Sequence, residues 1–338
     1  WRAHQRRVQA STPGLVPVAK GNGYGFGLAR LAAEAQALGV DTLAVGTGAE
    51  VAHVRDAFAG RIVVLQPWRA GEPGAEDLLG DERIIHTVSR VEDLAHLSAS
   101  DHRPTVLLEL LTSMRRHGLA VSELQSVRKV LADSRVEVAG WTVHLPMPAA
   151  TGSNADEAER LAKSGLAVRQ APVWFSHLTT DDYDRLRATL FIETRLRVGT
   201  ELWLGGSVRR RTTATVLDVH PVKRGEKVGY WQRSVPSDGQ ILVLAGGTAH
   251  GIALEAPTAA TTARQRLISV VNGSAEALGF ARSPYTIAGK KRWFVEPPHM
   301  QSSMVFVPGS KGIPAVGDEV PVELRLTTAT VDEVVLED

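Results

Sequence analysis

The chain has 338 residues and a formal net charge of +1, with 38 basic and 37 acidic residues. This length is enough for one large domain plus a smaller one, and the even charge balance lacks the basic face of a nucleic-acid-binding protein. No apolar run approaches a membrane span and no signal-peptide pattern opens the residues from Trp1 onward, so we expect a cytoplasmic enzyme without a membrane partner. The sequence contains no cysteine, which excludes disulfides, thiolate metal sites and cysteine catalysis, and we expect no metal.

Short apolar runs alternate with amphipathic segments over residues 1–205. The strand-like runs are 15–20, 42–47, 61–67, 84–90, 105–111, 136–145, 172–178 and 195–204. The helical patterns between them include 28–39, 49–58, 122–134 and 154–168. Runs that are apolar throughout are typical of parallel strands covered on both faces. Eight such units predict a (β/α)8 TIM-like barrel, with an open doubly wound sheet as the lesser alternative.

The rhythm changes after residue 205. Short apolar runs separated by Gly, Pro and Asp turns occupy residues 211–219, 226–235, 240–247, 292–298, 302–308 and 318–326. Long helical periodicity is nearly absent there, which predicts an all-β domain. We therefore expect an α/β barrel domain over residues 1–205 and a C-terminal β-domain over residues 206–338.

The stretch "VPVAKGNGYGFG" ends the first predicted strand on Lys20. Burying an isolated ammonium costs several kcal/mol unless it is paired or reacts. At the carboxyl end of a barrel strand, a lysine can instead form a Schiff base with a cofactor aldehyde. The glycines allow close approach to a planar ring, and Tyr24 offers a hydroxyl to a phosphate. Two alternatives are a nucleotide-binding loop, whose glycine spacing is wrong here, and a surface lysine beside a flexible turn.

The stretch that begins at Lys20 resembles the cofactor-lysine motif of the alanine racemases. It comprises Lys20, Gly21, Asn22, Gly23, Tyr24, Gly25 and Gly27. The alanine racemases are pyridoxal-phosphate enzymes of fold type III, built from a barrel and a β-domain. The resemblance runs from about residue 10 to about residue 335. It implies that Lys20 holds pyridoxal 5'-phosphate and transfers the α-proton on one face, while Tyr24 contacts the cofactor phosphate.

Further barrel segments are similar to the family. "LLTSMRRHGL" implies that Arg116 contacts the substrate carboxylate and the cofactor's phenolic oxygen, and "WTVHLP" places His144 beside the pyridine ring. "RLRVG" implies that Arg197 faces the pyridine nitrogen, and Gly199 and Thr200 would offer backbone N–H groups to the phosphate. Each has a plainer interpretation: a solvated basic turn for Arg116, a core histidine for His144 and a surface ion pair for Arg197.

The β-domain segment "VKRGEKVGYWQR" resembles the family segment that carries a second catalytic base, a tyrosine serving the partner subunit's site. That role falls on Tyr230, because Tyr183 lies in a helix-like segment and Tyr285 in a Gly/Pro-rich loop. The plainer interpretation is an ordinary strand aromatic. Met300 aligns with a methionine whose backbone N–H helps hold the substrate carboxylate. The resemblance thus implies a homodimer with shared active sites that acts on a small-molecule amino acid.

The implied reaction is racemisation, with alanine as the leading substrate. Lys20 and Tyr230 would act as bases on opposite faces of the substrate. Arg197 cannot readily protonate the pyridine nitrogen, which disfavours decarboxylation and transamination. One alternative is a fold type III decarboxylase, disfavoured because that branch resembles a cysteine-containing motif. Another is a pyridoxal-phosphate-binding homologue without racemase turnover.

The chain departs from the family pattern at several positions. Glu109 replaces a modified, negatively charged lysine, and its carboxylate could orient Arg116 through a charge-assisted pair. The chain also stops at Asp338, before a family segment with a phosphate-contacting tyrosine. The other departures are Thr248 and His250 for a Tyr and an Asp at the substrate entrance, His177 for an asparagine and Gln301 for an aspartate. They predict weak discrimination against larger amino acids, unless His250, Trp231 or the 275–300 loop fills the entrance.

Overall fold

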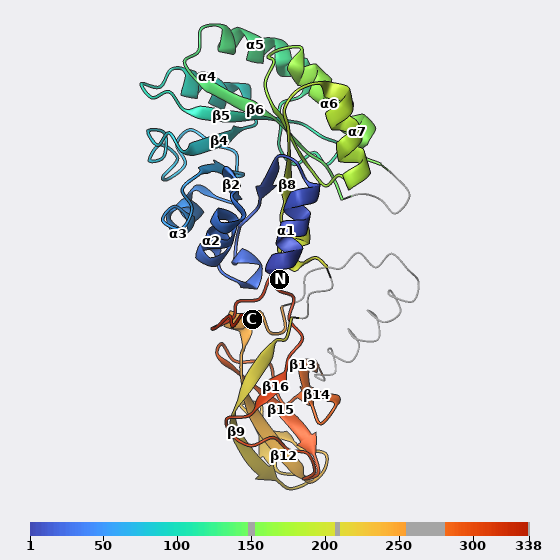
Figure 1. The fold of residues 1–338 in the computed structure, drawn as a ribbon. Helices are drawn as coiled ribbons and strands as arrows, with labels where there is room; N and C mark the ends of the chain where they lie inside the picture. The colour runs from blue at the N-terminus through green and yellow to red at the C-terminus, as the bar shows by residue number, and fades with distance from the viewer. Residues whose placement is uncertain (148–152, 207–209, 255–280, 337–338) are drawn as a thin grey trace. The chain divides into compact units, whose positions relative to one another are not determined.

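The computed structural model describes residues 1–147, 153–206, 210–254 and 281–336. The chain divides into two compact units, Trp1–Val208 and Arg209–Asp338 (Figure 1). The boundary expected after residue 205 stays a sequence-based prediction, because residues 207–209 lie outside the described ranges.

The first unit is built on eight parallel strands. They are β1 Leu15–Pro17, β2 Thr42–Val45, β3 Arg61–Val64, β4 Ile84–Val88, β5 Thr105–Leu110, β6 Glu137–His144, β7 Val173–Ser176 and β8 Thr194–Val198. Their hydrogen-bonded order is β1-β8-β7-β6-β5-β4-β3-β2. A parallel bridge between Val18 and Ala44 then joins β1 to β2, and Ala19 N–H donates to Ala44 O at 2.8 Å. The predicted barrel is confirmed, and the open-sheet alternative is wrong.

Helices follow the strands and cover the outside of this sheet (Figure 1). They are α1 Arg2–Ser11, α2 Leu28–Leu38, α3 Val51–Val54, α4 Val91–Ser98, α5 Leu124–Ala132, α6 Ala155–Leu166, α7 Thr180–Leu190 and α8 Thr200–Leu204, with short 3-10 turns η1 Gly23–Gly25, η2 Gly48–Glu50 and η3 Val121–Glu123. The strand expected over 195–204 is therefore too long. Gly199, with φ −114° and ψ −86°, leaves the extended conformation and begins α8, which buries Leu202 and Trp203. Across the described residues, no helix combines the length and apolar character needed to cross a bilayer.

The strands are apolar on both faces because each face has its own core. The barrel interior holds Val16, Val18, Ala44, Val63, Ile85, Leu107 and Trp174. A second set of buried side chains, including Leu108, Trp141 and Phe175, packs with residues of the surrounding helices. This double burial explains the unbroken apolar runs of the sequence.

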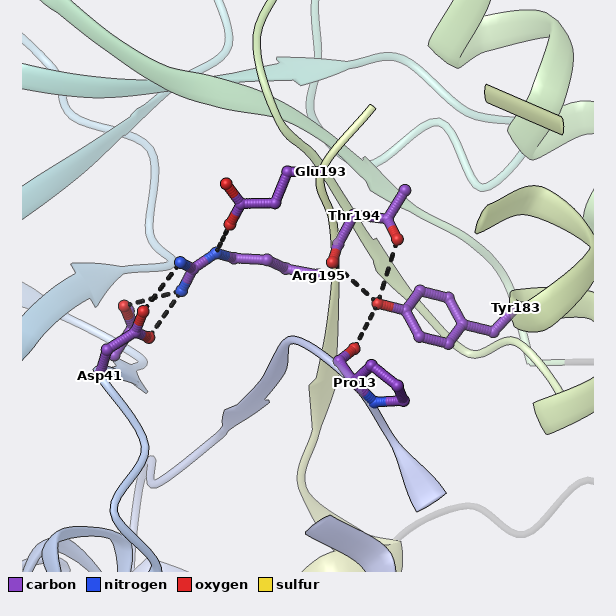
Figure 2. A network of polar contacts seen from close by, with 7 residues as sticks. Pro13, Asp41, Tyr183, Glu193, Thr194 and Arg195 are labelled. Carbon is purple, nitrogen blue, oxygen red and sulfur yellow. Dashed lines mark hydrogen bonds and ion pairs between the residues drawn. The ribbon is translucent and has the colours of Figure 1, made fainter. Parts of the chain in front are cut away.

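Strand β8 is tied to the start of β1 by Tyr183, which is buried on α7 (Figure 2). The Tyr183 hydroxyl lies 2.7 Å from Pro13 O and 3.0 Å from Thr194 O, so its one hydrogen is shared between the two carbonyls. Tyr183 is thereby occupied in closing the barrel.

Arg195 makes a second tie at the same end of the barrel (Figure 2). Its Nη1 and Nη2 donate to both oxygens of Asp41 at 2.7 and 2.9 Å, and its Nε donates to Glu193 at 2.8 Å. The guanidinium also lies over the Trp174 ring, 5.2 Å from its centroid. Because Asp41 directly precedes β2, this pair links the beginnings of β8 and β2 across β1. The hydrogen bonds from Arg195 hold the pKa of Asp41 below its ordinary value.

Arg195→Lys is expected to lower the free energy of unfolding by about 1 kcal/mol at neutral pH, because a lysine cannot form the paired hydrogen bonds. The effect stays this small because the Asp41 side chain is largely exposed. Since the pKa of Asp41 is depressed in the folded state, its contribution is present above its ordinary pKa of about 4 and is lost as the pH falls through the lower folded value. Urea unfolding of wild type and variant should therefore converge in acid. Arg187→Lys, whose partner Asp184 lies 3.4 Å away at the surface, serves as the control. A difference that persists unchanged in acid would contradict this assignment.

In its described residues the second unit is built of β-strands, as predicted. Its strands are β9 Thr213–Val222, β10 Lys227–Val228, β11 Arg233–Ser234, β12 Gly239–Ala245, β13 Arg282–Ile287, β14 Lys290–Phe294, β15 Ser302–Pro308 and β16 Glu319–Pro321, with a 3-10 turn η4 Thr248–His250. Six of them form a sheet in the order β13-β14-β15-β12-β9-β16, and β10 and β11 form a separate hairpin. A bridge between Tyr285 and Val322 connects β13 with the segment after β16.

Two sequence-based expectations for this unit are wrong. Residues 226–235 do not form one strand, because the chain turns between β10 and β11 at residues 229–232. Tyr285 does not lie in a loop: it is fully buried on β13, where its hydroxyl contacts the carbonyl of Gly246 at 2.8 Å.

Candidate active site

Lys20 lies just beyond β1, at the carboxyl end of the barrel strands, and its side chain is exposed. The surrounding barrel mouth partly desolvates the ammonium, and this lowers the pKa of Lys20. The positive charges of Arg116 and Arg197 lower it further, whereas Glu50 opposes them. The amine therefore gives up its proton more easily than an ordinary lysine, as a nucleophile or a base requires.

The glycine-rich turn after Lys20 presses Tyr24 against the start of α8. Tyr24 is buried in the left-handed region at φ 55°, and its N–H donates to Asn22 Oδ1 at 3.1 Å. A Cβ added to Gly199 would lie 2.1 Å from the Tyr24 hydroxyl, so only glycine fits there. Burial raises the pKa of Tyr24, and a hydrogen bond with the Thr200 side chain opposes the rise. Tyr24, Gly199 and Thr200, the predicted phosphate contacts, thus lie together.

Glu50 holds the turn after β1 to the end of β2, a role that sequence reasoning missed. Its Oε1 accepts from Gly21 N–H at 2.9 Å and its Oε2 from Gly46 N–H at 2.7 Å. A Cβ added to Gly46 would meet both Glu50 and the Lys20 Cβ at about 3 Å. The only sequence signal is an acidic residue directly before the helix that follows β2.

His144 is the last residue of β6 and lies among cations. Its Nδ1 is 2.8 Å from Ser176 Oγ and 3.5 Å from Arg197 Nη2. Because a guanidinium can only donate, Nδ1 is the acceptor and the ring proton lies on Nε2. Burial, then Arg197 and Arg116, lower the pKa of His144 to about 2, so the imidazole is neutral. Ser176, which ends β7, is a second residue that sequence reasoning missed.

Arg197 and Glu109 are the charged groups buried inside the barrel mouth. Burial lowers the pKa of Arg197 to about 10, against the pull of Glu109, so the guanidinium stays charged at neutral pH. Burial raises the pKa of Glu109, and Arg197 opposes this more than Arg116 does. Arg116 acts on Glu109 only through its charge, and no ion pair of the described residues joins the two, so the charge-assisted pair that Glu109 could make is not formed. Arg197 Nε and Glu109 Oε2 are buried without a hydrogen-bond partner within the described ranges, which leaves polar capacity for a bound molecule.

Arg116 lies on the exposed loop that follows β5, and its charge acts on Lys20 and on both histidines of the site. This loop is fixed at both ends. Ser113 donates its N–H and its hydroxyl to Glu157 at 2.6 and 2.7 Å. At Gly118, where φ is +133°, an added Cβ would lie 2.4 Å from Leu111 N, so the loop closes only with glycine.

His177, which replaces a family asparagine, faces the same mouth. Its backbone is in the left-handed region at φ 57°, a strained conformation that functional sites often retain. Its Nδ1 lies 2.9 Å from Leu145 O and therefore carries the proton, which makes Nε2 the acceptor. Its ring lies 5.0 Å from that of His144. Burial lowers the pKa of His177, and Arg197 and Lys20 lower it further.

The second unit brings Tyr230 and Met300 into one loop cluster. Tyr230 lies on the turn between β10 and β11 with 83% of its surface exposed, so the strand-aromatic interpretation is wrong. Its ring is 5.2 Å from that of His299, the neighbour of Met300. Tyr183 and Tyr285 are 1% and 0% exposed and hydrogen-bonded, so neither phenol is accessible.

The entrance residues expected from the sequence lie on η4 in the same cluster. Thr248 is exposed, and His250 Nε2 lies 3.2 Å from Asp332 Oδ1. The Met300 side chain is exposed, and no hydrogen bond of the described residues uses its N–H. Of the 275–300 loop, residues 275–280 lie outside the described residues.

A (β/α)8 barrel with a lysine after its first strand, followed in the chain by an antiparallel β-domain, defines a two-domain α/β class of protein. The family model described as the alanine racemase N-terminal domain matches residues 1–192, more than half of the chain. The chain belongs to the alanine racemase family.

Known proteins support this assignment over most of the chain. An alanine racemase of Nitratidesulfovibrio vulgaris (strain DSM 19637 / Miyazaki F) is 26% identical over 289 residues, covering 73% of this chain and 72% of the relative. An alanine racemase of Campylobacter concisus (strain 13826) is 24% identical over 243 residues, covering 66% of this chain and 67% of the relative. The fold is similar to that of the Bartonella henselae alanine racemase with covalently bound pyridoxal phosphate, with a TM-score of 0.70, 20% identity and coverage of 97% and 90%. The alanine racemase of Clostridium difficile 630 has a TM-score of 0.67 and 17% identity, and the match covers 95% of this chain and 82% of that one.

Proposed function

We propose that this protein is a pyridoxal-phosphate-dependent amino-acid racemase, with alanine as its leading substrate, that acts as a homodimer with shared sites. The observation that carries the proposal is Lys20: its lowered pKa and its place beside Arg116 and Arg197, at the carboxyl end of the barrel, suit a cofactor lysine. Membership of the alanine racemase family supports the same cofactor, as does the similarity to the Bartonella henselae alanine racemase, which holds pyridoxal phosphate covalently.

The barrel mouth fits pyridoxal phosphate chemically. Tyr24, Gly199 and Thr200 would hold the phosphate, since a hydroxyl and a backbone without Cβ meet there. His144 would lie beside the ring as a neutral imidazole. Arg197, whose Nε is buried without a partner in the described part of the chain, would hold the pyridine nitrogen.

Racemisation requires that a proton leave one face of the substrate Cα and return on the other. Pyridoxal phosphate, when bound, withdraws electrons from Cα and makes its hydrogen acidic. Lys20 Nζ would then take or return the proton on one face and Tyr230 Oη on the opposite face. Arg116 would hold the substrate carboxylate by paired hydrogen bonds, and the open N–H of Met300 would add a further donor.

Arg197 directs the reaction toward proton transfer. A guanidinium with a pKa of about 10 keeps its proton at neutral pH, so it does not transfer that proton to the pyridine nitrogen. With the ring nitrogen left unprotonated, the bound cofactor would withdraw electrons from Cα less strongly, which would disfavour decarboxylation and transamination.

The test begins with protein incubated with pyridoxal phosphate and freed of excess cofactor. We expect a covalently bound chromophore, loss of optical rotation from L-alanine and no release of CO₂. Release of CO₂ would identify a decarboxylase. A bound chromophore with unchanged optical rotation would identify a cofactor-binding homologue without turnover.

Thr248 is expected to leave the substrate choice broad. It replaces a bulky phenol, and a pocket contact of one methylene is worth about 1–3 kcal/mol, so L-serine and L-lysine should be racemised alongside L-alanine. Thr248→Tyr should raise the preference for alanine about tenfold or more, whereas Thr248→Ser should not. The measurement is kcat/KM for the three amino acids. A wild-type preference for alanine above about a thousandfold, roughly 4 kcal/mol, would mean that other groups, such as His250 or Trp231, close the entrance.

A further inference from the structure

The backbone of Tyr230 is anchored although its side chain is largely exposed. The residue lies on the turn formed by residues 229–232 between the two-residue strands β10 and β11. A hairpin this short does not hold a side chain in place by itself. Tyr230 N–H, however, donates to Glu296 Oε2 at 2.6 Å, from the segment between β14 and β15.

Glu296 is a buried carboxylate with both oxygens occupied. It is 4% exposed, and its Oε1 lies 2.7 Å from His299 Nε2 while its Oε2 accepts from Tyr230 N–H. Gly229 has φ +73°, and an added Cβ would lie 2.4 Å from Glu296 Oε2, so the hairpin packs directly on the carboxylate. A buried carboxylate must keep its donors, which makes this contact specific.

His299 forms a wall beside the phenol. Its ring centroid lies 5.2 Å from that of Tyr230, with 42° between the planes. The backbone of this wall is itself pinned to η4, since Thr248 N–H donates to His299 O at 2.9 Å and Ala249 N–H to Met300 O at 3.1 Å. The loop that presents Met300 and the hairpin that presents Tyr230 are therefore joined through Glu296.

We infer that Glu296 is the positioning residue of Tyr230, with His299 as the second member of the array. Glu296 does not touch the substrate; it fixes where the phenol is held through the backbone of Tyr230 and through the ring of His299. The inference rests on the proposed function, in which Tyr230 is the second base.

The first test uses the protein without cofactor and needs no activity. The chain has four tyrosines, so labelling tyrosine rings with 13C gives few NMR signals, and Tyr230→Phe identifies that of Tyr230. Glu296→Ala should shift or broaden this signal and leave the buried Tyr285 of the same unit unchanged. Glu296→Gln, which can still accept from Tyr230 N–H and contact His299, should stay close to wild type. Glu323→Ala, which removes a surface partner of Lys291, is the matched control.

An unmoved Tyr230 signal in Glu296→Ala would overturn the inference. If that variant loses the Tyr285 signal and so fails to fold, His299→Phe replaces it. This change keeps an aromatic wall but removes the donor to Glu296 Oε1. The Tyr230 signal should again move with Tyr285 fixed, and an unmoved signal would again overturn the inference.

The second test separates positioning from general damage in the holoenzyme. In D₂O, Lys20 can exchange the α-hydrogen of one enantiomer with solvent and return a deuteron to the same face, a cycle that does not need Tyr230. Glu296→Ala should lower racemisation about 10- to 100-fold, as expected for a misplaced catalytic group, while this one-sided exchange persists. Equal loss of racemisation and of exchange with both enantiomers would overturn the inference. A wild-type holoenzyme that neither racemises amino acids nor exchanges their α-hydrogen would instead refute the proposed function. The NMR test would still decide whether Glu296 positions Tyr230, because it does not depend on activity.

Discussion

Lys20→Ala is expected to abolish both the covalent capture of pyridoxal phosphate and racemisation. The side chain is exposed at the end of β1, so its removal should cost little stability. It would remove the amine that bonds the cofactor and one of the two bases. Since a general base alone contributes about 10²–10⁴-fold, the rate should fall by about three orders of magnitude or more. The measurements are borohydride reduction followed by peptide mass mapping, and the rate of L-alanine racemisation.

The matched control for this experiment is Lys163→Ala on α6. Lys163 is a surface lysine of the same unit and pairs with Glu159 at 2.6 Å. Its replacement should leave the reduced adduct on Lys20 and the rate unchanged. If Lys20→Ala keeps its activity and the reduced adduct is found on another lysine, Lys20 is not the cofactor lysine.

Mixing inactive Lys20→Ala with inactive Tyr230→Phe is expected to restore racemisation. Tyr230 is exposed on the β-domain and, in a shared-site dimer, would serve the barrel of the other subunit. One of the two sites in each mixed dimer would then combine an intact Lys20 with an intact Tyr230. After complete subunit exchange, about half of the dimers are mixed, so about a quarter of the wild-type activity should return.

The double variant Lys20→Ala/Tyr230→Phe provides the control for this recovery. Mixed with Tyr230→Phe, it forms dimers in which no site has both bases, so no activity should appear. Subunit exchange is checked by co-purification of differently tagged chains. Exchange without recovery would mean that each chain builds its site from its own lysine and tyrosine, or that Tyr230 is not the second base.

The strand pattern predicts the barrel because parallel strands buried on both faces leave a plain apolar signal. It fails where that signal is weak. In β13, "RSPYTI", the proline and polar residues hide a strand whose Ser283, Tyr285 and Ile287 point inward. Proline is tolerated there because the pairing of β13 with β14 is interrupted between Arg282 and Thr286, the stretch that contains Pro284. At 195–204, an apolar run continues from strand into helix, and only the backbone at Gly199 separates the two.

The residues of the candidate site that lie at or near the ends of barrel strands could be predicted from the sequence. Lys20 follows β1, His144 ends β6 and Arg197 lies one residue before the end of β8, and a parallel barrel gathers such residues at one face. Glu50 and Glu296 could not be found in this way. Each acts on the backbone N–H of a residue far away in the sequence, Gly21 and Tyr230 respectively. A carboxylate that binds a main-chain N–H places no demand on the side chain of its partner, so the sequence carries no paired signal.

The pairing of β1 with β8 governs when the barrel can be completed. Leu15 lies opposite Leu196, so the partners are 181 positions apart in the sequence. During synthesis, the nascent chain leaves the edge of β1 unpaired until β8 has left the ribosome, and such long-range pairing is slow. The family match stops at residue 192, two residues before β8 begins. A fragment cut at that boundary would expose the edges of β1 and β7 and would lack the strand that carries Arg197, so the unit defined by sequence similarity is shorter than the compact unit Trp1–Val208 of the structure.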